Sequence, residues 1–338
     1  MIKNTSKPVL ATIGQVVEIR PISGADLIVS ADIVCGIHGR WKAVVGKDTT
    51  VGQQLVVFLQ DAILPPDPRW MFLEQSKFRI RVRHIKGAPS ECLAMNLEEY
   101  LQGQYQVGDD LTEVIGVKKY EKPIPVTMMG DIIGSFPDFI PKTDESNFQT
   151  IPYVFDILKD NYFYVSIKAD GTSCTVYKDD TLHVCSRNWE LREFTDQGKT
   201  NVYWTVARKY GLDKLPKGYA LQFEVVGPGI QGNPMGLDSV EMRAFRLIHF
   251  NESGYHGYMK NSDMELINIC NDHKWPFVEI VENLSWFNHV NQYPNITHET
   301  LLEWADQKYK NGKPAEGIVI RSSLGKFSFK VLNLRYGK

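Results

Sequence analysis

The 338-residue chain has few cysteines, no long apolar run and no strong excess of charge of either sign. Its five cysteines are odd in number and widely spaced, without a Cys-x-x-Cys pair, so they indicate neither a disulfide framework nor a zinc site. We therefore expect an intracellular protein from a reducing compartment, cytoplasm or nucleus. No run approaches the ~18 apolar residues of a membrane-spanning helix, and no apolar stretch follows a basic one near the first residue, so we expect neither a membrane span nor a signal peptide.

The formal net charge of -2 excludes a chain that is basic throughout. If nucleic acid binds, the cations that hold it must be gathered locally. Internal repeats and low-complexity tracts are also missing. What remains, 43% hydrophobic and 23% charged residues, is ordinary for a globular protein, and the length is enough for about two domains.

The first part of the chain reads as short strands separated by turn signals. Predicted strands cover residues 14–19, 28–34, 41–45, 54–59 and 78–85. Short strands at this density predict a small β-barrel of the oligonucleotide-binding (OB) type. We therefore predict an OB-like, nucleic-acid-binding domain over residues 1–117. A linker is expected over residues 118–130, where charged residues run into two prolines without apolar periodicity.

The last of these predicted strands is the most basic stretch of the chain. A period of two places its apolar side chains on one face, and its cations on the other: Lys77, Arg79, Arg81 and Arg83. Four like charges in a row repel one another unless an anion lies opposite, so we predict that this face binds a phosphate backbone. Acidic partners within the fold, or charges that protect a solvated strand edge, are the alternative.

The second predicted domain, residues 131–338, contains a lysine placed just before a turn. Residues 164–168 alternate apolar and polar side chains, as in a half-buried strand, and Gly171 ends the run. Lys168 and Asp170 are two apart and share a face. Taken alone, this pair is equally consistent with a surface ion pair. Helices are predicted over residues 195–210, 263–271 and 297–310, the last one capped by Thr297.

Lys168-Ala169-Asp170-Gly171 resembles the nucleophile motif of the covalent nucleotidyltransferases, which comprise DNA ligases, RNA ligases and messenger-RNA capping enzymes. Further motifs of that superfamily follow in a fixed order, and this chain is similar to each of them. They lie at residues 186–188, 222–227, 248–251, 316–321 and 326–330. The resemblance covers residues 131–338 and implies an α+β chain: an OB-like barrel followed by a nucleotidyltransferase domain of antiparallel sheets flanked by helices.

The resemblance implies a role for each matched position. Lys168 is the nucleophile toward the α-phosphorus of ATP. Arg187 contacts the ribose and, with Asn188, the acceptor strand. Phe250 stacks on the base and Val319 covers its opposite face, although Phe250 is equally consistent with a core residue. The residues implied to contact the nucleotide are Lys168, Arg187, Glu224, Phe250, Val319, Lys326 and Lys330.

The carboxylates Asp170, Glu224 and Glu316 are the expected ligands of Mg²⁺ or Mn²⁺, or of its waters, because these ions prefer oxygen donors. The alternative interpretation of each acid is an ordinary surface residue. A lysine attacks phosphorus only when it is unprotonated, so a metal ion and the lysines of the last motif are expected to lower its pKa. That motif is usually Lys-x-Lys, whereas here Lys326 and Lys330 are four residues apart.

The order of the domains distinguishes the relatives. Only eight residues follow Lys330, which leaves no room for the C-terminal barrel of DNA ligases and capping enzymes. An N-terminal barrel, with the strings at residues 20–28, 142–145 and 223–233, is similar to RNA ligases of the Deinococcus/Naegleria type. The resemblance implies an ATP-dependent enzyme that joins a 3′-hydroxyl to a 5′-phosphate through lysyl-AMP and an AMP-capped end.

We expect the substrate to be RNA in a nicked duplex, and the protein to be a monomer without an obligate protein partner. Two alternatives stay open. A capping-type guanylyltransferase shares Lys168, Glu224 and Glu316 but uses GTP. A transfer-RNA-binding or structural protein with a decayed site belongs to a different class, and the full set of carboxylates and lysines argues against it.

Overall fold

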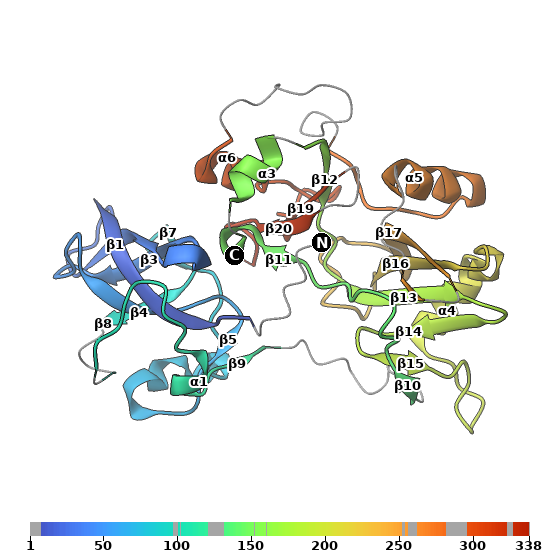
Figure 1. Ribbon diagram of the computed structural model, residues 1–338, viewed down its shortest axis with the longest axis horizontal. Helices are drawn as coiled ribbons and strands as arrows, with labels where there is room; N and C mark the ends of the chain where they lie inside the picture. Colours follow the sequence, from blue (N-terminus) through green and yellow to red (C-terminus); the bar gives the residue numbers. More distant parts are fainter. Residues whose placement is uncertain are drawn as a thin grey trace. The chain divides into compact units, whose positions relative to one another are not determined.

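The structure is a computed structural model. It describes residues 8–96, 101, 103–120, 132–151, 153–159, 161–251, 254–255, 262–281, 296–322 and 327–337. The chain forms two compact units (Figure 1). The first contains residues up to 122 together with Phe148–Val154, and the second contains Pro123–Asn147 and Phe155–Gly337. No helix among the described residues is long and apolar enough to cross a membrane.

The first unit is built on an antiparallel sheet of five strands in the order β3-β2-β1-β4-β8. Their bounds are β1 Ala11–Pro21, β2 Ile28–Val34, β3 Arg40–Gly46, β4 Gln54–Phe58 and β8 Leu93–Asn96. Alternation decides the faces, since Trp41, Ala43 and Val45 of β3 are buried. The first four predicted strands are thus confirmed.

Short elements complete this unit. They are η1 Gly36–His38, β5 Ala62–Ile63, η2 Pro68–Ser76, β6 Arg83–Ile85, β7 Ala88–Ser90, α1 Thr112–Ile115, β9 Lys118–Lys119 and η3 Phe148–Thr150. Strand β9 pairs with β5, so regular structure continues just beyond residue 117, where we expected the linker to begin.

The predicted strand over residues 78–85 is wrong for most of its length. Lys77 and Phe78 have φ values of 53° and 58°, which reverse the chain after η2, and regular strand begins only at Arg83. Trp70 and Ile80 are buried in the core of this unit. The burial of Ile80 agrees with the alternation, but main-chain hydrogen bonds from Phe78 to Leu73 at 3.0 Å and from Arg79 to Ser76 at 3.1 Å form a turn where a strand was expected.

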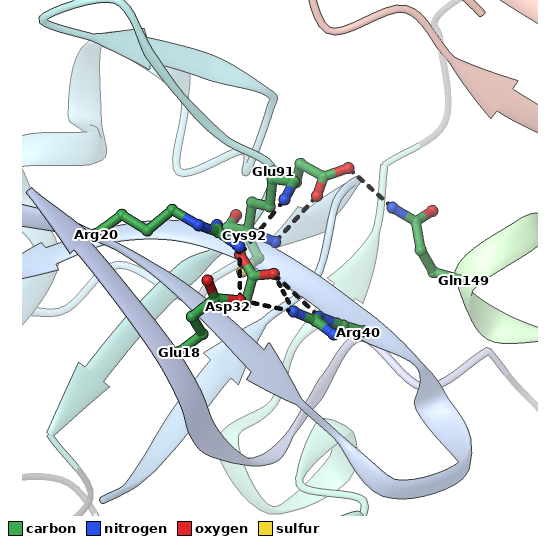
Figure 2. Close-up of polar contacts among 8 residues, drawn as sticks. Glu18, Arg20, Asp32, Arg40, Glu91, Cys92 and Gln149 are labelled. Atoms are coloured by element: carbon green, nitrogen blue, oxygen red, sulfur yellow. Dashed lines mark hydrogen bonds and ion pairs between the residues drawn. The ribbon is translucent and has the colours of Figure 1, made fainter. Parts of the chain in front are cut away.

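A polar network lies on one face of β1–β3 (Figure 2). Asp32, whose side chain is 1% exposed, accepts hydrogen bonds from Arg20, Arg40 and Lys42. Burial raises the pKa of Asp32, but the hydrogen bonds from Arg40 and Arg20 and the charge of Lys42 outweigh it, and the net shift is downward. These three cations are therefore engaged within the fold.

Glu91 is a second buried acid of the first unit. It accepts hydrogen bonds from the Lys42 amide at 3.0 Å and from the Gln149 side chain at 2.8 Å (Figure 2). Gln149 lies in η3, directly after the strand β11 (Ser146–Asn147). Burial raises the pKa of Glu91 to about 7, against the lowering effects of Lys42 and Gln149.

Glu91→Gln is expected to stabilise the first unit at pH 8 and to leave it nearly unchanged at pH 5. An acid whose pKa is raised in the folded state binds more protons there, so wild-type stability falls as the pH rises from about 4.5 to about 7, by about 3 kcal/mol in total. The new amide needs an acceptor, and Gln149 Oε1, which lacks a hydrogen-bond partner among the described residues, becomes one when the Gln149 amide rotates.

Hydrogen–deuterium exchange of the β3 amides, corrected for intrinsic rates, measures this effect locally. The control is Glu74→Gln, since Glu74 is exposed. Wild-type protection that increases between pH 5 and pH 8 would contradict the prediction.

The second unit contains two sheets. A seven-stranded sheet has the order β10-β15-β14-β13-β16-β17-β18, and a four-stranded sheet the order β11-β20-β19-β12. The larger comprises β10 Ile132–Ser135, β13 Thr172–Lys178, β14 Leu182–Cys185, β15 Trp189–Leu191, β16 Tyr219–Val226, β17 Glu241–Asn251 and β18 Gly254–Tyr255. The smaller comprises β11, β12 Phe163–Ile167, β19 Gly317–Ser322 and β20 Ser328–Leu332.

Helices α4 and α5 cover one face of the larger sheet (Figure 1). The described helices are α3 Val154–Lys159, α4 Val202–Lys209, α5 Ser262–His273 and α6 His298–Trp304, with the short η4 Leu212–Lys214. Side chains of α4 and α5 pack on Val176, Phe223 and Ala244. Alternation directs Ser173 and Glu224 to the opposite face.

The predicted helices exist but two are shorter than expected. The first begins only at Val202, with Asn201 as its N-cap, because residues 194–200 form a turn closed by a bridge between Phe194 and Thr200. The third has the expected Thr297 N-cap, which forms a capping box with Thr300, but ends at Trp304. The residues after it run to the nucleophile candidate, as described below.

The two sheets of this unit are joined by the segment 276–281. Val278 donates its amide proton to Ala244 of β17 at 2.9 Å, and Val281 donates to Val165 of β12 at 2.8 Å. The segment therefore holds the strand that precedes Lys168 in a set position relative to the sheet that carries Glu224. This fold confirms the predicted α+β class.

Candidate active site

Lys168 follows directly after β12, whose five residues are all buried. Its amide donates to the Gly317 carbonyl at 2.9 Å, and the amide of Ile167 donates to the main-chain carbonyl of Glu279 at 2.8 Å. The main chain is thus held from both sides at the point where the lysine side chain leaves the sheet. Such anchoring places a reactive group on a rigid element.

The Lys168 ammonium pairs with one carboxylate and is affected by the charges of two more. Its Nζ lies 2.7 Å from Glu316 Oε2, and the two side chains are 22% and 16% exposed. Burial lowers the pKa of Lys168, but the charges of Glu316, Glu224 and Asp170 outweigh it and raise the pKa above its ordinary value. Without nucleotide the lysine is therefore a protonated, ion-paired cation that remains accessible from solvent.

The other two acids have hydroxyl partners. Glu224 lies opposite Ser173 in the pairing of β16 with β13, and the Ser173 hydroxyl donates to it at 2.8 Å. Asp170 accepts a hydrogen bond from the Tyr336 hydroxyl. Gly171 allows the chain after Asp170 to lie close against β16, because a Cβ there would lie 2.4 Å from the Val225 carbonyl oxygen.

The donors present suit a magnesium or manganese ion, since carboxylate oxygens are the ligands these ions prefer. The described side chains do not, however, form a ready-made cluster of three acids, cysteines or histidines able to hold a metal together. Mg²⁺ keeps several waters and shares substrate phosphates, so one or two of Asp170, Glu224 and Glu316 are enough to hold it beside a nucleotide.

The last motif is divided between described and undescribed residues. Lys330 of β20 lies opposite Val319 of β19, so the two side chains share a face of the smaller sheet. Lys326 lies outside the described residues. On the same strand as Val319, Arg321 donates to Ser166 at 3.2 Å and to Glu145 at 3.0 Å.

Arg187 and Asn188 meet the string at residues 142–145. Arg187 forms an ion pair with Asp144 at 2.6 Å, and Asn188 Oδ1 accepts a hydrogen bond from Lys142 at 2.8 Å. Two segments singled out separately in the sequence therefore lie together. The Asp144 carboxylate thus pairs with an arginine in the connection between β14 and β15.

Phe250 is packed as a core residue, with Phe139 and Tyr177 at ring distances of 5.3 and 6.1 Å. A second aromatic residue of β17, Phe245, lies at a β-bulge, and its ring lies 5.1 Å from the guanidinium carbon of Arg321. Bulges redirect side chains near functional sites. Sequence reasoning missed Phe245, because a bulge leaves no mark in the periodicity.

The basic stretch of the first unit is partly neutralised. Arg79 pairs with Asp61, its side chain is only 18% exposed, and its guanidinium lies 3.4 Å from the centre of the Tyr120 ring. Lys77, Arg81 and Arg83 are exposed. The four cations therefore do not form one strand face. Arg79 instead pairs with an acid of the same fold, which was the alternative to phosphate binding.

An OB-type barrel followed by two sheets that bring a strand-end lysine among three carboxylates defines a nucleic-acid ligase of the nucleotidyltransferase class. The profile of the RNA ligase family matches residues 161–332, and that of an OB-fold domain matches residues 10–97. The chain belongs to the RNA ligase family.

Solved structures of a Naegleria gruberi RNA ligase are similar over the whole length. An apo variant is 32% identical with a TM-score of 0.80, and covers 98% of both chains. A variant with ATP and Mn is 31% identical with a TM-score of 0.79, covering 97% of this chain and 98% of the other. A variant with AMP and Mn is 33% identical with a TM-score of 0.79 and the same coverage. No match was found among curated protein sequences.

Proposed function

We propose that this RNA ligase joins a 3′-hydroxyl to a 5′-phosphate in three steps that begin at Lys168. The observation that carries the proposal is the placement of the Lys168 amine, 2.7 Å from Glu316 and within the fields of Glu224 and Asp170, at the end of a rigid strand. An amine held there can act as a nucleophile once it loses its proton. ATP is the proposed nucleotide, supported by the ATP and AMP in the structures of the Naegleria gruberi enzyme.

In the first step the Lys168 nitrogen attacks the α-phosphorus, the bond to the bridging oxygen breaks, and pyrophosphate leaves. In the second step the 5′-phosphate of RNA displaces the lysine and takes the AMP. In the third the 3′-hydroxyl attacks that phosphate, a phosphodiester bond forms, and AMP leaves. Each step exchanges one bond at phosphorus for another, so no oxidant or reductant is needed.

Positive charge is required because phosphoryl transfer spreads negative charge over the phosphate oxygens. Lys330 supplies one cation, and Lys326 is proposed as a second. When bound, Mg²⁺ or Mn²⁺ neutralises phosphate charge and lowers the pKa of the amine. Asp170, Glu224 and Glu316 are the side chains proposed to hold that ion or its waters.

For the nucleotide we propose Val319 on one face of the base and an aromatic ring of β17 on the other. Phe250 is the residue indicated by the motif, and its packing leaves it in the core. Phe245, which contacts Arg321 two residues from Val319 on β19, is the second candidate. Arg187 is proposed to contact the ribose and, with Asn188, the acceptor strand.

Incubation with α-labelled ATP and GTP, followed by nick sealing, tests the function. We expect label on Lys168 from ATP, and sealing of a nicked RNA duplex with a 5′-phosphate and a 3′-hydroxyl. Label from GTP in preference to ATP would indicate the guanylyltransferase alternative, and no label from either would indicate a decayed site. Comparing all four DNA and RNA strand combinations at the nick defines the substrate.

Replacing Lys77, Arg81 and Arg83 by serine is expected to weaken RNA binding while lysine adenylation continues at nearly the wild-type rate, because the first step does not involve RNA. The slope of log K against log salt should decrease by about 0.9 for each duplex phosphate that the variant no longer neutralises. Filter binding at several salt concentrations measures the slope.

The matched control removes three exposed lysines of the same unit, Lys47, Lys118 and Lys119. If both triple variants weaken RNA binding equally, the effect comes from net charge alone and not from the position of these three cations. Equal loss of adenylation and sealing in the first variant would assign its cations to the fold or the ATP site.

A further inference from the structure

Two tyrosines that no motif indicated form hydrogen bonds with the segment that contains Lys168 and Asp170. The first is Tyr309, which follows α6 and is 4% exposed. Its hydroxyl donates to the Lys168 carbonyl at 2.9 Å and accepts from the Glu316 amide at 3.2 Å. One buried hydroxyl thus connects the main chain of the lysine to that of the acid that pairs with it.

The second is Tyr336, in the turn that follows β20, and its hydroxyl donates to Asp170 Oδ2. The turn is attached to the same part of the site. Tyr336 donates its amide proton to Asn333 at 3.1 Å, and the Asn333 amide donates to the Glu316 carbonyl at 3.0 Å. The turn after β20 therefore forms hydrogen bonds with both Asp170 and Glu316.

We propose that Tyr309 and Tyr336 are positioning residues for lysine adenylation, Tyr309 by fixing the main chain of Lys168 to that of Glu316 and Tyr336 by orienting the Asp170 carboxylate. The proposal rests on the function proposed for Lys168. A carboxylate rotates broadly about its last side-chain bond, so a hydrogen bond to one oxygen is what gives it a single orientation. Partners of this kind act through the groups that touch the substrate.

The rings and the hydroxyls have separable roles. Both rings pack with Ile167 and Ala315 in one hydrophobic cluster. Tyrosine-to-phenylalanine substitution keeps that packing and removes only the hydroxyl. Tyr219 provides a matched control, because its hydroxyl donates to the Glu265 carboxylate at 2.9 Å in the same unit, between β16 and α5.

The experiment compares Tyr336→Phe with Tyr219→Phe in single-turnover adenylation by ATP and Mn²⁺. We expect Tyr336→Phe to lower the rate constant at saturating ATP by about 10- to 100-fold, and Tyr219→Phe to leave it within about 2-fold. Equilibrium binding of ATP, measured by calorimetry with each change placed on Lys168→Ala, should stay within about 2-fold of the parent. A fall in the rate without a fall in binding is the signature of an interaction made in the transition state.

A rate for Tyr336→Phe equal to that of Tyr219→Phe would overturn the proposal. So would a parallel loss of rate, ATP binding and thermal midpoint, since that is a purely structural effect. Tyr309→Phe should show the same separation of rate from binding. If it fails to fold, the half-buried Tyr336 alone decides. Absence of label on Lys168 in the wild type would instead overturn the proposed function.

Discussion

Lys168→Ala is expected to abolish covalent labelling by ATP. Only an unprotonated amine at this position forms the bond to phosphorus, and the methyl group of alanine offers no nucleophile. The loss should exceed about a thousandfold, below detection in a labelling gel, because removing a nucleophile that acts as part of a unit removes the whole step. Mass spectrometry of the digested wild type should place AMP on Lys168.

Lys168→Arg is the matched control for charge. Arginine stays protonated in proteins and can replace the ion pair with Glu316, but it does not attack. Both variants should be unlabelled, and Lys168→Arg should keep more of the folded stability. The third step does not use the lysine amine, so Lys168→Ala should still seal a strand supplied with AMP on its 5′-phosphate. AMP on another lysine would contradict the assignment.

Alanine substitution of Asp170, Glu224 or Glu316 is the second large effect. Each acid raises the pKa of Lys168. If that were their whole role, each alanine variant would leave more free amine near neutral pH and would be adenylated faster. If they hold the metal ion, each variant should be slower, by about 100- to 1,000-fold, the usual scale for removing one electrostatic interaction from an active site. We expect the slower outcome.

Single-turnover adenylation at several Mn²⁺ concentrations distinguishes the two roles. Glu316→Ala separates the two roles most clearly, because Glu316 directly contacts Lys168 and its loss would free the amine most if the pKa were its whole role. Glu193→Ala, which removes an acid paired with Arg208 elsewhere in the unit, is the control. Partial rescue by high Mn²⁺ fits a weakened ion site. Full wild-type activity in excess chelator would rule out an obligatory metal.

The sequence by itself determined the class of fold and singled out candidate site residues that the fold brings together. Strands β1–β4 follow period-two alternation, and α6 starts at the predicted Thr297 cap, because both signals are set by residues close along the chain. The motif order singled out Lys168 and Glu316, 148 positions apart in the chain, and the two side chains meet at 2.7 Å. A motif consists of the residue types that a reaction needs at set spacings, so it can be recognised from the sequence without a structure.

Tertiary packing decided features that the local sequence pattern did not predict or predicted wrongly. Residues 77–80 form a turn instead of the predicted strand, with the Phe78 and Arg79 amides bonded back to Leu73 and Ser76, and the Arg79 side chain pairs with Asp61. Phe245 was redirected by a bulge.

Tyr309 reaches Lys168 across 141 positions and Tyr336 reaches Asp170 across 166, so no window of the sequence contains both partners of either bond. A hydroxyl that supports a catalytic group has no residue pattern of its own. Its role is defined only by where the folded chain brings it.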